Sequence, residues 1–468
     1  MGVAALVSLA SRPPALPHPW ARAERFGKCP RAAHFRLTSV PHADTFSLAV
    51  LAGAVTIFLA LASSTVTRYV PFPVPALLLL AASVAATAIP RVGTALTVTM
   101  VEQIATTALI FVLFDGGMQV GMARIKKAIK PILNLGLLGT LLTAGGMALA
   151  AHVMLGGSWA FALLLATALA PTDPAVMFSV LGAKEVAGRS GTILEGESGA
   201  NDPVSIALMV AVLAVFESAG GSPWSAVGTF FAQLLIGLAV GLAGGRGLHW
   251  AMRHRPLERA GLPPLRTLAG AGAIYGVASL LAGSGFLAVF AAGIVLGDAR
   301  APHKEEIVGF HNSLANLSEV AAFVALGLTV PIGSLLAHWI WAWGLALAAV
   351  LALVVRPLAI APLLALARLT WGERMFICWA GLKGAVPILL AAYARTAHVA
   401  GGRRLYELVF VVVTASVLVQ GAGVPGAARL FNVPMRTRLE GASSSLLVAR
   451  RRVRTETWTP GASVPDRS

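Results

Sequence analysis

Two aspartates lie inside long apolar stretches of the chain, where a carboxylate is costly. Asp173 stands in ALLLATALAPTDPAVMFSVLG, and Asp202 stands in GTILEGESGANDPVSIALMVAVLAVF. An ionisable side chain in a membrane-spanning stretch normally faces a partner or a watery cavity, and it marks an ion path. The two aspartates therefore predict a cation or proton site. The alternative interpretation is that they only cap the ends of loops.

Prolines surround the first aspartate, in the run Ala170-Pro171-Thr172-Asp173-Pro174. Because proline lacks a backbone donor and clashes with the preceding turn, we expect the helix to break here. Unwound backbone at membrane depth is tolerated only where it lines a cavity or is buried in protein. The freed carbonyls and the Thr172 hydroxyl would offer oxygen ligands to a dehydrated alkali cation. The alternative is a proline kink in which Asp173 satisfies backbone donors.

The second aspartate closes the segment EGESGANDP, which spans residues 195–203. On a helix, Glu195, Ser198 and Asp202 share one face, at i, i+3 and i+7. We expect Ser198 and Asp202 to point at a common ion, and the i, i+4 pair Glu197 and Asn201 to support them. Burial favours the protonated form of a carboxylate, and a bound cation favours the ionised form. Competition between the two for Asp202 would couple their flows.

A third interrupted stretch, GLKGAVP at residues 381–387, lies in the other half of the chain. Paired interrupted spans in the two halves of a transporter are the best sequence indicator of its binding site. Lys383 would be a buried cation in need of a carboxylate, and Glu197 is the partner we predict. The alternative is a lysine that extends its ammonium group to the membrane interface.

Two further charged residues lie within apolar stretches. Asp115, in LIFVLFDGGMQV, would either line a funnel towards the site or cap a helix at the interface. Arg356, in LALVVRPLAI, would pair with Glu319 or with the exposed carbonyls of a broken helix. We expect a structural role for Arg356, because a cation repels cations. His311 and His338 show the pattern of ordinary loop or interface histidines.

Composition indicates an all-α polytopic membrane protein. Of the 468 residues, 57% are hydrophobic and only 12% are charged, whereas soluble domains carry about 25% charged residues. The mean hydropathy is +0.79, and the apolar runs are continuous rather than alternating, which excludes a barrel of short strands. The net charge of +16 comes from short loops and tails, so we expect no nucleic-acid partner. The two cysteines have neither disulfide-framework nor zinc spacing.

About thirteen membrane-spanning helices are expected. They lie near residues 46–68, 71–90, 101–122, 131–155, 158–182, 191–218, 224–252, 267–283, 285–298, 312–333, 338–366, 375–396 and 405–424. Lys and Arg gather in the odd-numbered loops, such as RIKKAIK after the third span, so these loops and the C-terminus are predicted to be cytoplasmic. Residues 1–45 are predicted to be a disordered basic extension, 46–430 the transmembrane domain, and 431–468 a disordered basic tail.

The motifs LFDGGM, TDPA, EGESGANDP, GSGFLAVFAAGIVLG and ERMFICWAGLKGAVPILLA occur in this order between about residues 46 and 430. Together they resemble the monovalent cation:proton antiporters, most closely the NhaP-type branch with its CvrA-like potassium/proton antiporters. The resemblance implies a sodium/proton antiporter fold of thirteen spans. Two inverted repeats, a dimerisation part, a mobile core and two crossed unwound helices belong to that fold.

By motif match, Thr172 and Asp173 would lie where the unwound helices cross, and Ser198 and Asp202 would complete the ion site. Relatives with a second aspartate at the position of Asn201 tend to be electrogenic, so this chain resembles the electroneutral type. The family usually has arginine at the position of Lys383. CvrA-like members often carry a cytosolic regulatory region, and this chain ends about forty residues after its last span.

The sequence therefore predicts a secondary active antiporter that exchanges Na⁺ or K⁺ for H⁺ by alternating access, as a homodimer in the cell membrane. A channel or a non-transporting sensor on the same fold is the alternative. We expect no cofactor, and no metal beyond the transported alkali cation. An enzyme is disfavoured, because no nucleophile–base arrangement, histidine cluster or phosphate-binding loop is visible in the sequence.

Overall fold

A computed structural model describes residues 54, 58, 74–89, 96–181, 184–217, 223–257, 259, 261–336, 339–365 and 367–437. All of them belong to one unit of the chain, Gly53–Ser468. The predicted extension at residues 1–45, nearly all of the first predicted span at 46–68, His338 and the tail beyond residue 437 lie outside the described residues.

Helices form nearly all of the first half of this unit. They are α2 (Val74–Ala88), α4 (Val98–Leu133), the π-helical turn η1 (Asn134–Gly139), α5 (Thr140–Leu155), α6 (Trp159–Leu169), α7 (Pro174–Leu181), α8 (Gly188–Glu217) and α9 (Pro223–His254). A short strand, β1 (Lys184–Val186), separates α7 from α8.

The second half has the same character. Its helices are α10 (Leu262–Leu280), α11 (Gly285–Gly297), α12 (Lys304–Leu328), α13 (Ile332–Leu336), α14 (Ile340–Val350), the π-helical turn η3 (Leu351–Val355), α15 (Arg356–Ala365), α16 (Trp371–Trp379), α17 (Ala385–Thr396), α18 (Gly402–Ala415), the π-helical turn η4 (Ser416–Gly421) and α19 (Ala422–Leu430). A strand β2 (Met435–Thr437) follows, beyond the boundary at residue 430 that the sequence predicts.

Within the described residues, six helical stretches are long and apolar enough to cross a membrane. They are Val98–Ala123, Ala128–Leu155, Gly188–Phe216, Trp224–His254, Ile340–Ala365 and Gly402–Leu430. The expectation of a helical polytopic protein is therefore confirmed, whereas thirteen spans are not found. Two predicted spans, 158–182 and 375–396, are each divided into two shorter helices, and a third, 285–298, is the short helix α11.

The basic stretch RIKKAIK lies at a kink within α4, between the apolar stretches Val98–Ala123 and Ala128–Leu155, where the sequence predicts a loop. Two non-helical residues bend this long helix, Gly121 with φ 67° and Ala128 with φ −129°. The Asp298 carboxylate lies against Gly121 and accepts a hydrogen bond of 2.5 Å from the Ala123 amide. It thereby provides an acceptor for a backbone amide at the bend. The basic segment therefore joins two apolar helical stretches, as the sequence predicts, although it is kinked helix rather than open loop.

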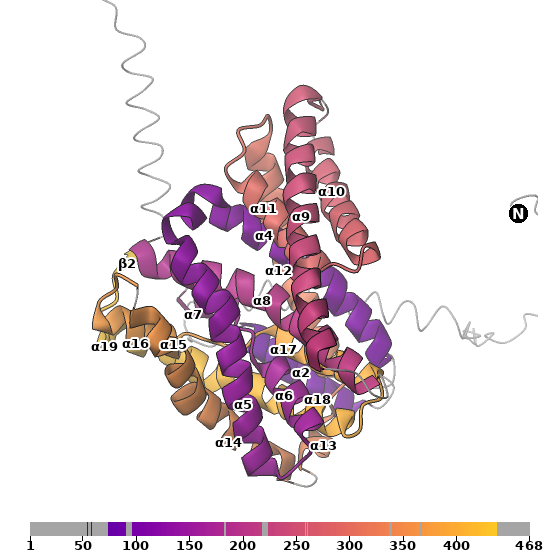
Figure 1. The fold of residues 1–468 in the computed structure, drawn as a ribbon, viewed down its shortest axis with the longest axis vertical. Helices are drawn as coiled ribbons and strands as arrows, with labels where there is room; N and C mark the ends of the chain where they lie inside the picture. Colours follow the sequence, from indigo (N-terminus) through magenta and orange to yellow (C-terminus); the bar gives the residue numbers. More distant parts are fainter. Residues whose placement is uncertain are drawn as a thin grey trace, which may run out of the picture. The chain divides into compact units, whose positions relative to one another are not determined.

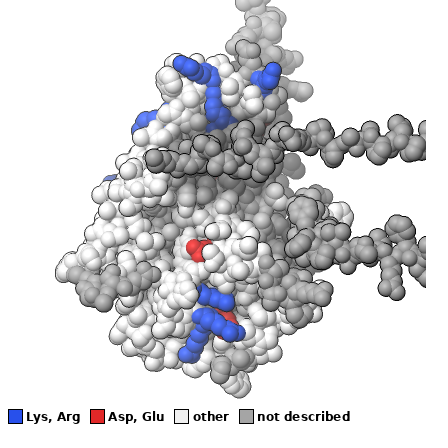
Figure 2. Space-filling model, turned by 90° about the vertical axis from the view of Figure 1, so that its right-hand side faces the viewer, with Lys and Arg blue, Asp and Glu red and all other residues white. Residues whose placement is uncertain are grey.

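Two neighbouring sets of helices frame the interior. In one, α9, α10 and α11 lie side by side, and α11 and α12 both pack against α4 (Figure 1). In the other, α6 packs against α5, α8 and α17, and α17 packs against α18. On the face in Figure 2, Lys and Arg gather near the top and in the lower part of the described surface, and an acidic patch is visible between them. Basic residues at two separate levels fit a chain that spans a membrane.

The two strands form a small antiparallel sheet. Lys184 pairs with Thr437 and Val186 pairs with Met435. The Ala187 amide extends this pairing with a hydrogen bond of 2.8 Å to the Pro434 carbonyl. The segment after the last helix is thereby attached to the connection between α7 and α8.

Candidate functional site

The predicted helix break at the first aspartate is present. Helix α6 ends at Leu169 and α7 begins at Pro174, so Ala170–Asp173 form an unwound link. Proline at position 174 opens α7, where the missing donor is harmless, and this placement is typical of a first helical turn. The Asp173 amide donates to the Leu382 carbonyl at 2.8 Å, which connects this link to the second interrupted helix.

That second interruption lies between α16 and α17, at Ala380–Gly384. Glycine is required at two of its positions, because a Cβ atom at Gly381 would overlap the Arg356 guanidinium group. A Cβ atom at Gly384 would likewise overlap the Asp173 carboxylate. The two breaks therefore cross at close quarters, as the sequence predicts from paired interrupted spans.

Lys383 occupies the centre of this crossing and is only 1% exposed. Its ammonium group donates to the carbonyls of Ala170, at 3.1 Å, and Pro171, at 2.8 Å. These carbonyls are free because α6 has ended and the prolines interrupt the backbone ladder. The predicted ion pair with Glu197 is wrong: the lysine fills the electronegative end of a broken helix instead, which is a favoured place for a cation.

Glu197 pairs with Arg356, which donates to its Oε1 atom at 3.0 Å. The same guanidinium group donates to the carbonyls of Cys378, at 3.1 Å, and Ile377, at 3.3 Å, near the end of α16. Both charged side chains are about 2% exposed. The expectation that Arg356 would bind the carbonyls of a broken helix is confirmed, and its alternative pairing with Glu319 is wrong. The fork of an arginine suits this triple contact better than the single point of a lysine.

Three polar side chains next to the first break hold one another in place. The Asn201 amide donates to the Thr172 hydroxyl at 2.7 Å and accepts from the Thr172 backbone amide at 3.4 Å. The Thr172 and Ser198 hydroxyls are 3.1 Å apart. Asn201 therefore fixes the unwound link from the side of α8. This contact fits the supporting place that the sequence predicts for it.

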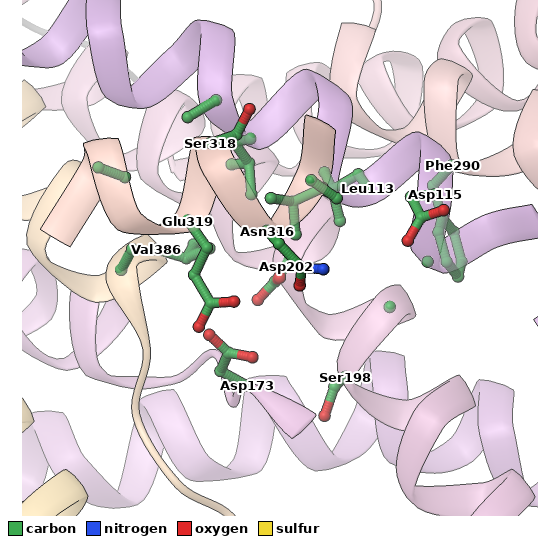
Figure 3. Close-up of a pocket in the computed structure, with 18 of the residues that line it drawn as sticks. Leu113, Asp115, Asp173, Ser198, Asp202, Phe290, Asn316, Ser318, Glu319 and Val386 are labelled. Carbon is green, nitrogen blue, oxygen red and sulfur yellow. The ribbon is translucent and has the colours of Figure 1, made fainter. Parts of the chain in front are cut away.

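A cavity of about 170 Å³ opens beside the crossing. Ser198 and Asp202 of α8 line it together with Asp173 (Figure 3), and Glu195 of α8 is also among its lining residues. The structure thus brings all three residues of the predicted α8 face to one wall. The lining is mainly apolar, but it includes these polar side chains, so the space can hold water beside the carboxylates.

Asp202 is the most telling residue in the cavity wall. Its side chain is 8% exposed, and its Oδ1 atom is buried without a hydrogen-bond partner. An unpartnered carboxylate oxygen in a protein interior is expensive, and such an atom normally binds a proton, a water molecule or an ion. The arrangement can therefore hold a monovalent cation or a proton at Asp202.

Asp115 also lines the cavity, and it is 3% exposed. It lies in the interior of α4 rather than at the end of a span, so it is not an interfacial cap. The Gln119 amide donates to its Oδ2 atom at 2.5 Å, and the Asn312 side chain also interacts with this carboxylate. A funnel role for Asp115 stays a prediction.

One acidic residue of the cavity was missed as a site residue. Glu319 projects from α12 into the cavity, with Asn312 and Asn316 on the same helix. These three residues are spaced at i, i+4 and i+7, so a helical projection of α12 shows them on one face. That spacing was the available signal, but the sequence analysis considered Glu319 only as a partner for Arg356. His311 is buried in α12, and its Nε2 atom lies 2.8 Å from the Thr267 hydroxyl.

Residues 53–429 match the family described as sodium/hydrogen exchanger, transmembrane. The chain belongs to this family. Within the described residues, no group of three or more His, Cys, Asp or Glu side chains could hold a metal ion.

Curated relatives carry antiporter names. The chain is 37% identical over 328 residues to the K(+)/H(+) antiporter NhaP of Alkalimonas amylolytica. The alignment covers 70% of this chain and 57% of the relative. It is 34% identical over 331 residues to the K(+)/H(+) antiporter NhaP2 of Shewanella oneidensis, with coverages of 70% and 57%. It is 26% identical over 357 residues to the Na(+)/H(+) antiporter ApNhaP of Aphanothece halophytica, with coverages of 72% and 66%. The chain thus spans a little over half the length of the first two relatives.

A solved structure shares the fold. The sodium proton antiporter MjNhaP1 of Methanocaldococcus jannaschii superposes with a TM-score of 0.71 at 21% identity, over 80% of this chain and 99% of that one. A second structure of the same antiporter gives a TM-score of 0.68 at 20% identity, with coverages of 82% and 97%. The antiporter fold that the sequence predicts is therefore confirmed at the level of architecture.

Proposed function

We propose that the protein is a secondary active antiporter that exchanges Na⁺ or K⁺ for H⁺ across the cell membrane. The observation that carries this proposal is Asp202, a buried carboxylate with an unpartnered oxygen in a cavity beside two crossed helix breaks. The names of the relatives support cation:proton exchange over a channel or a sensor. They also make an enzyme the weakest alternative.

Asp202 is the carrier, and it binds either a proton or the cation. Asp173, Thr172 and Ser198 supply the remaining oxygen ligands from the unwound link and from α8. Because one carboxylate cannot hold both ions, the flow of one ion drives release of the other. Asn201 in place of a second aspartate supports an electroneutral exchange of one cation for one proton.

The surrounding polar network is structural in this proposal. Asn201 positions Thr172, while Arg356 neutralises Glu197 and closes the end of α16. Lys383 stabilises the end of α6 through two carbonyls. The Asp115 carboxylate adds to the negative potential of the cavity, and this potential attracts cations.

The finer architecture belongs to the same proposal. It comprises thirteen spans in two inverted repeats, a homodimer, alternating access at the crossing, and a cytoplasmic C-terminus. Residues 1–45 and 431–468 are assigned as basic segments outside the membrane domain. The two broken helices in the two halves support the repeat, because interrupted spans in corresponding positions are typical of such transporters.

Everted membrane vesicles from a host that lacks its own antiporters test the proposal. A respiration-driven pH gradient should collapse on addition of NaCl or KCl with the wild-type protein. It should persist with Asp202→Asn, which removes the exchangeable charge. Glu305→Gln is the matched control, because Glu305 is an exposed carboxylate at the start of α12. Cation-dependent proton flux through Asp202→Asn would overturn the assignment, and cation flux without proton movement would indicate a channel.

A further inference from the structure

The cavity contains a carboxylate that the exchange scheme above does not use. Glu319 belongs to α12, which packs against α4 and α2, whereas Asp173 belongs to the link between α6 and α7. Figure 3 shows the two carboxyl groups pointing toward one another, and they interact electrostatically. Two separate groups of helices thus bring two acids to one point.

The Glu319 carboxyl group is not fully hydrogen-bonded at this point. Its Oε1 atom is buried and has no hydrogen-bond partner. Two ionised carboxyl groups that face each other in a protein interior repel strongly, so such pairs hold one proton between them. A shared proton gives one oxygen a donor and removes the repulsion, and this solution needs no further residue.

The charges around the pair favour the same protonation state. Asp115 of α4 and Glu195 and Asp202 of α8 line the cavity, and no Lys or Arg is among its described lining residues. Lys383, in the break before α17, acts electrostatically on Asp202. Arg356 lies behind the crossing, where Glu197 neutralises it. Because the charged neighbours in the cavity lining are acidic, a pair with one negative charge is repelled less than a pair with two.

We propose that Glu319 and Asp173 share one proton that stays in the protein throughout the exchange cycle. Glu319 is then a positioning residue: it donates to the Asp173 carboxylate and keeps it ionised and oriented as a cation ligand. Asp202, nine-tenths buried with an unpartnered oxygen, remains the group that releases its proton to water when the cation binds. One proton leaves for one cation, so exchange stays electroneutral. This inference rests on the proposed function.

Substitution of Glu319 should change the pH profile of exchange. In Glu319→Ala the Asp173 carboxylate loses the hydrogen bond from Glu319, so it binds a proton of its own more tightly, and this proton competes with the cation. The profile should move by about one pH unit to the alkaline side, the shift produced by a tenfold change in proton affinity. At neutral pH the apparent KM for Na⁺ or K⁺ should rise about tenfold, while the maximal rate changes little.

Glu319→Gln is the conservative variant, because its amide also donates to Asp173. Its pH profile and KM should lie closer to the wild type than those of Glu319→Ala. Glu305→Gln makes the same chemical change on the same helix outside the cavity, and it should match the wild type. A pH profile of Glu319→Ala identical to that of the wild type would overturn the inference.

A double-mutant cycle gives an independent decision. In Asp173→Asn the acid at Glu319 is free to ionise, so it supplies the negative charge and exchange persists at a reduced rate. Glu319→Gln should then cost at least about tenfold more in the Asp173→Asn background than in the wild type. Equal effects in both backgrounds would contradict a shared proton. This cycle also decides the matter if Glu319→Ala fails to fold.

The two levels of the proposal fail in different ways. Vesicles in which the wild type shows no exchange, or in which Asp202→Asn retains it, would refute the antiporter assignment itself. A wild type that exchanges, a silent Asp202→Asn and an additive Asp173–Glu319 cycle would refute only the shared proton. Each protein is first compared for membrane content and for a monodisperse profile in detergent.

Discussion

The Arg356–Glu197 pair gives the sharpest stability prediction. Replacement of Arg356 by Met keeps most of the side-chain volume but leaves the Glu197 carboxylate buried without its cation. Because both side chains are about 2% exposed, solvent screening is small. Removal of one partner from such a pair destabilises a protein by about 3–5 kcal/mol. At about 2 °C per kcal/mol for a large domain, the midpoint of thermal unfolding should fall by roughly 6–10 °C.

A second substitution separates the pair from its surroundings. Glu197→Gln in the Arg356→Met background removes the stranded charge, so it should restore more than half of the lost midpoint. Recovery stays partial, because Arg356 also serves the carbonyls of Ile377 and Cys378. The same Glu197→Gln change should not rescue Lys383→Met, since Lys383 donates to Ala170 and Pro171 instead.

Retention of a monodisperse peak after heating in detergent is the suitable assay, because large membrane proteins unfold irreversibly. Arg403→Met is the control, since it removes an ion pair whose Arg403 side chain is 72% exposed. Exposed pairs contribute little, so its midpoint should move by less than about 2 °C. Equal rescue of Arg356→Met and Lys383→Met by Glu197→Gln, or rescue of neither, would refute the assigned pairing.

Two further predictions concern transport in vesicles. Gly384→Ala places a methyl group on the Asp173 carboxylate, so the exchange rate should fall at least about tenfold. Gly276→Ala is the control, because no atom lies near its added Cβ, and it should match the wild type. Equal exchange rates in the two variants would contradict the close crossing. Asn201→Asp adds a second titratable group and removes the donor to Thr172. An imposed membrane potential should therefore change the exchange rate of this variant but not that of the wild type. A variant whose exchange rate does not respond to the potential would contradict the electroneutral assignment.

Features that depend on local backbone chemistry could be predicted from the sequence. Pro171 and Pro174 end and restart a helix wherever the chain places them, and Gly381 and Gly384 permit close contact in any packing. The shared face of Glu195, Ser198 and Asp202 follows from helical periodicity alone. These rules act within a few residues, so they hold without knowledge of the tertiary structure.

Choices between distant partners could not be predicted in the same way. Lys383 and Arg356 are both basic residues that could pair with Glu197. Which of them does so depends on how α15 is rotated relative to α8. The π-helical turn η3, immediately before Arg356, adds to this rotation in a way that residue spacing does not reveal. Glu319 was missed as a site residue for a related reason, because its role depends on which helix α12 faces.

The small sheet of β1 and β2 gives the C-terminal segment a direct connection to the helix that carries Asp202. Strand β1 lies immediately before α8, which lines the cavity, and β2 follows the last helix. Tension applied to the chain beyond Thr437 therefore reaches the start of α8 without passing back through α18 and α19. For protein engineering, a fusion joined after Thr437 preserves this clasp, whereas one joined before Met435 releases it.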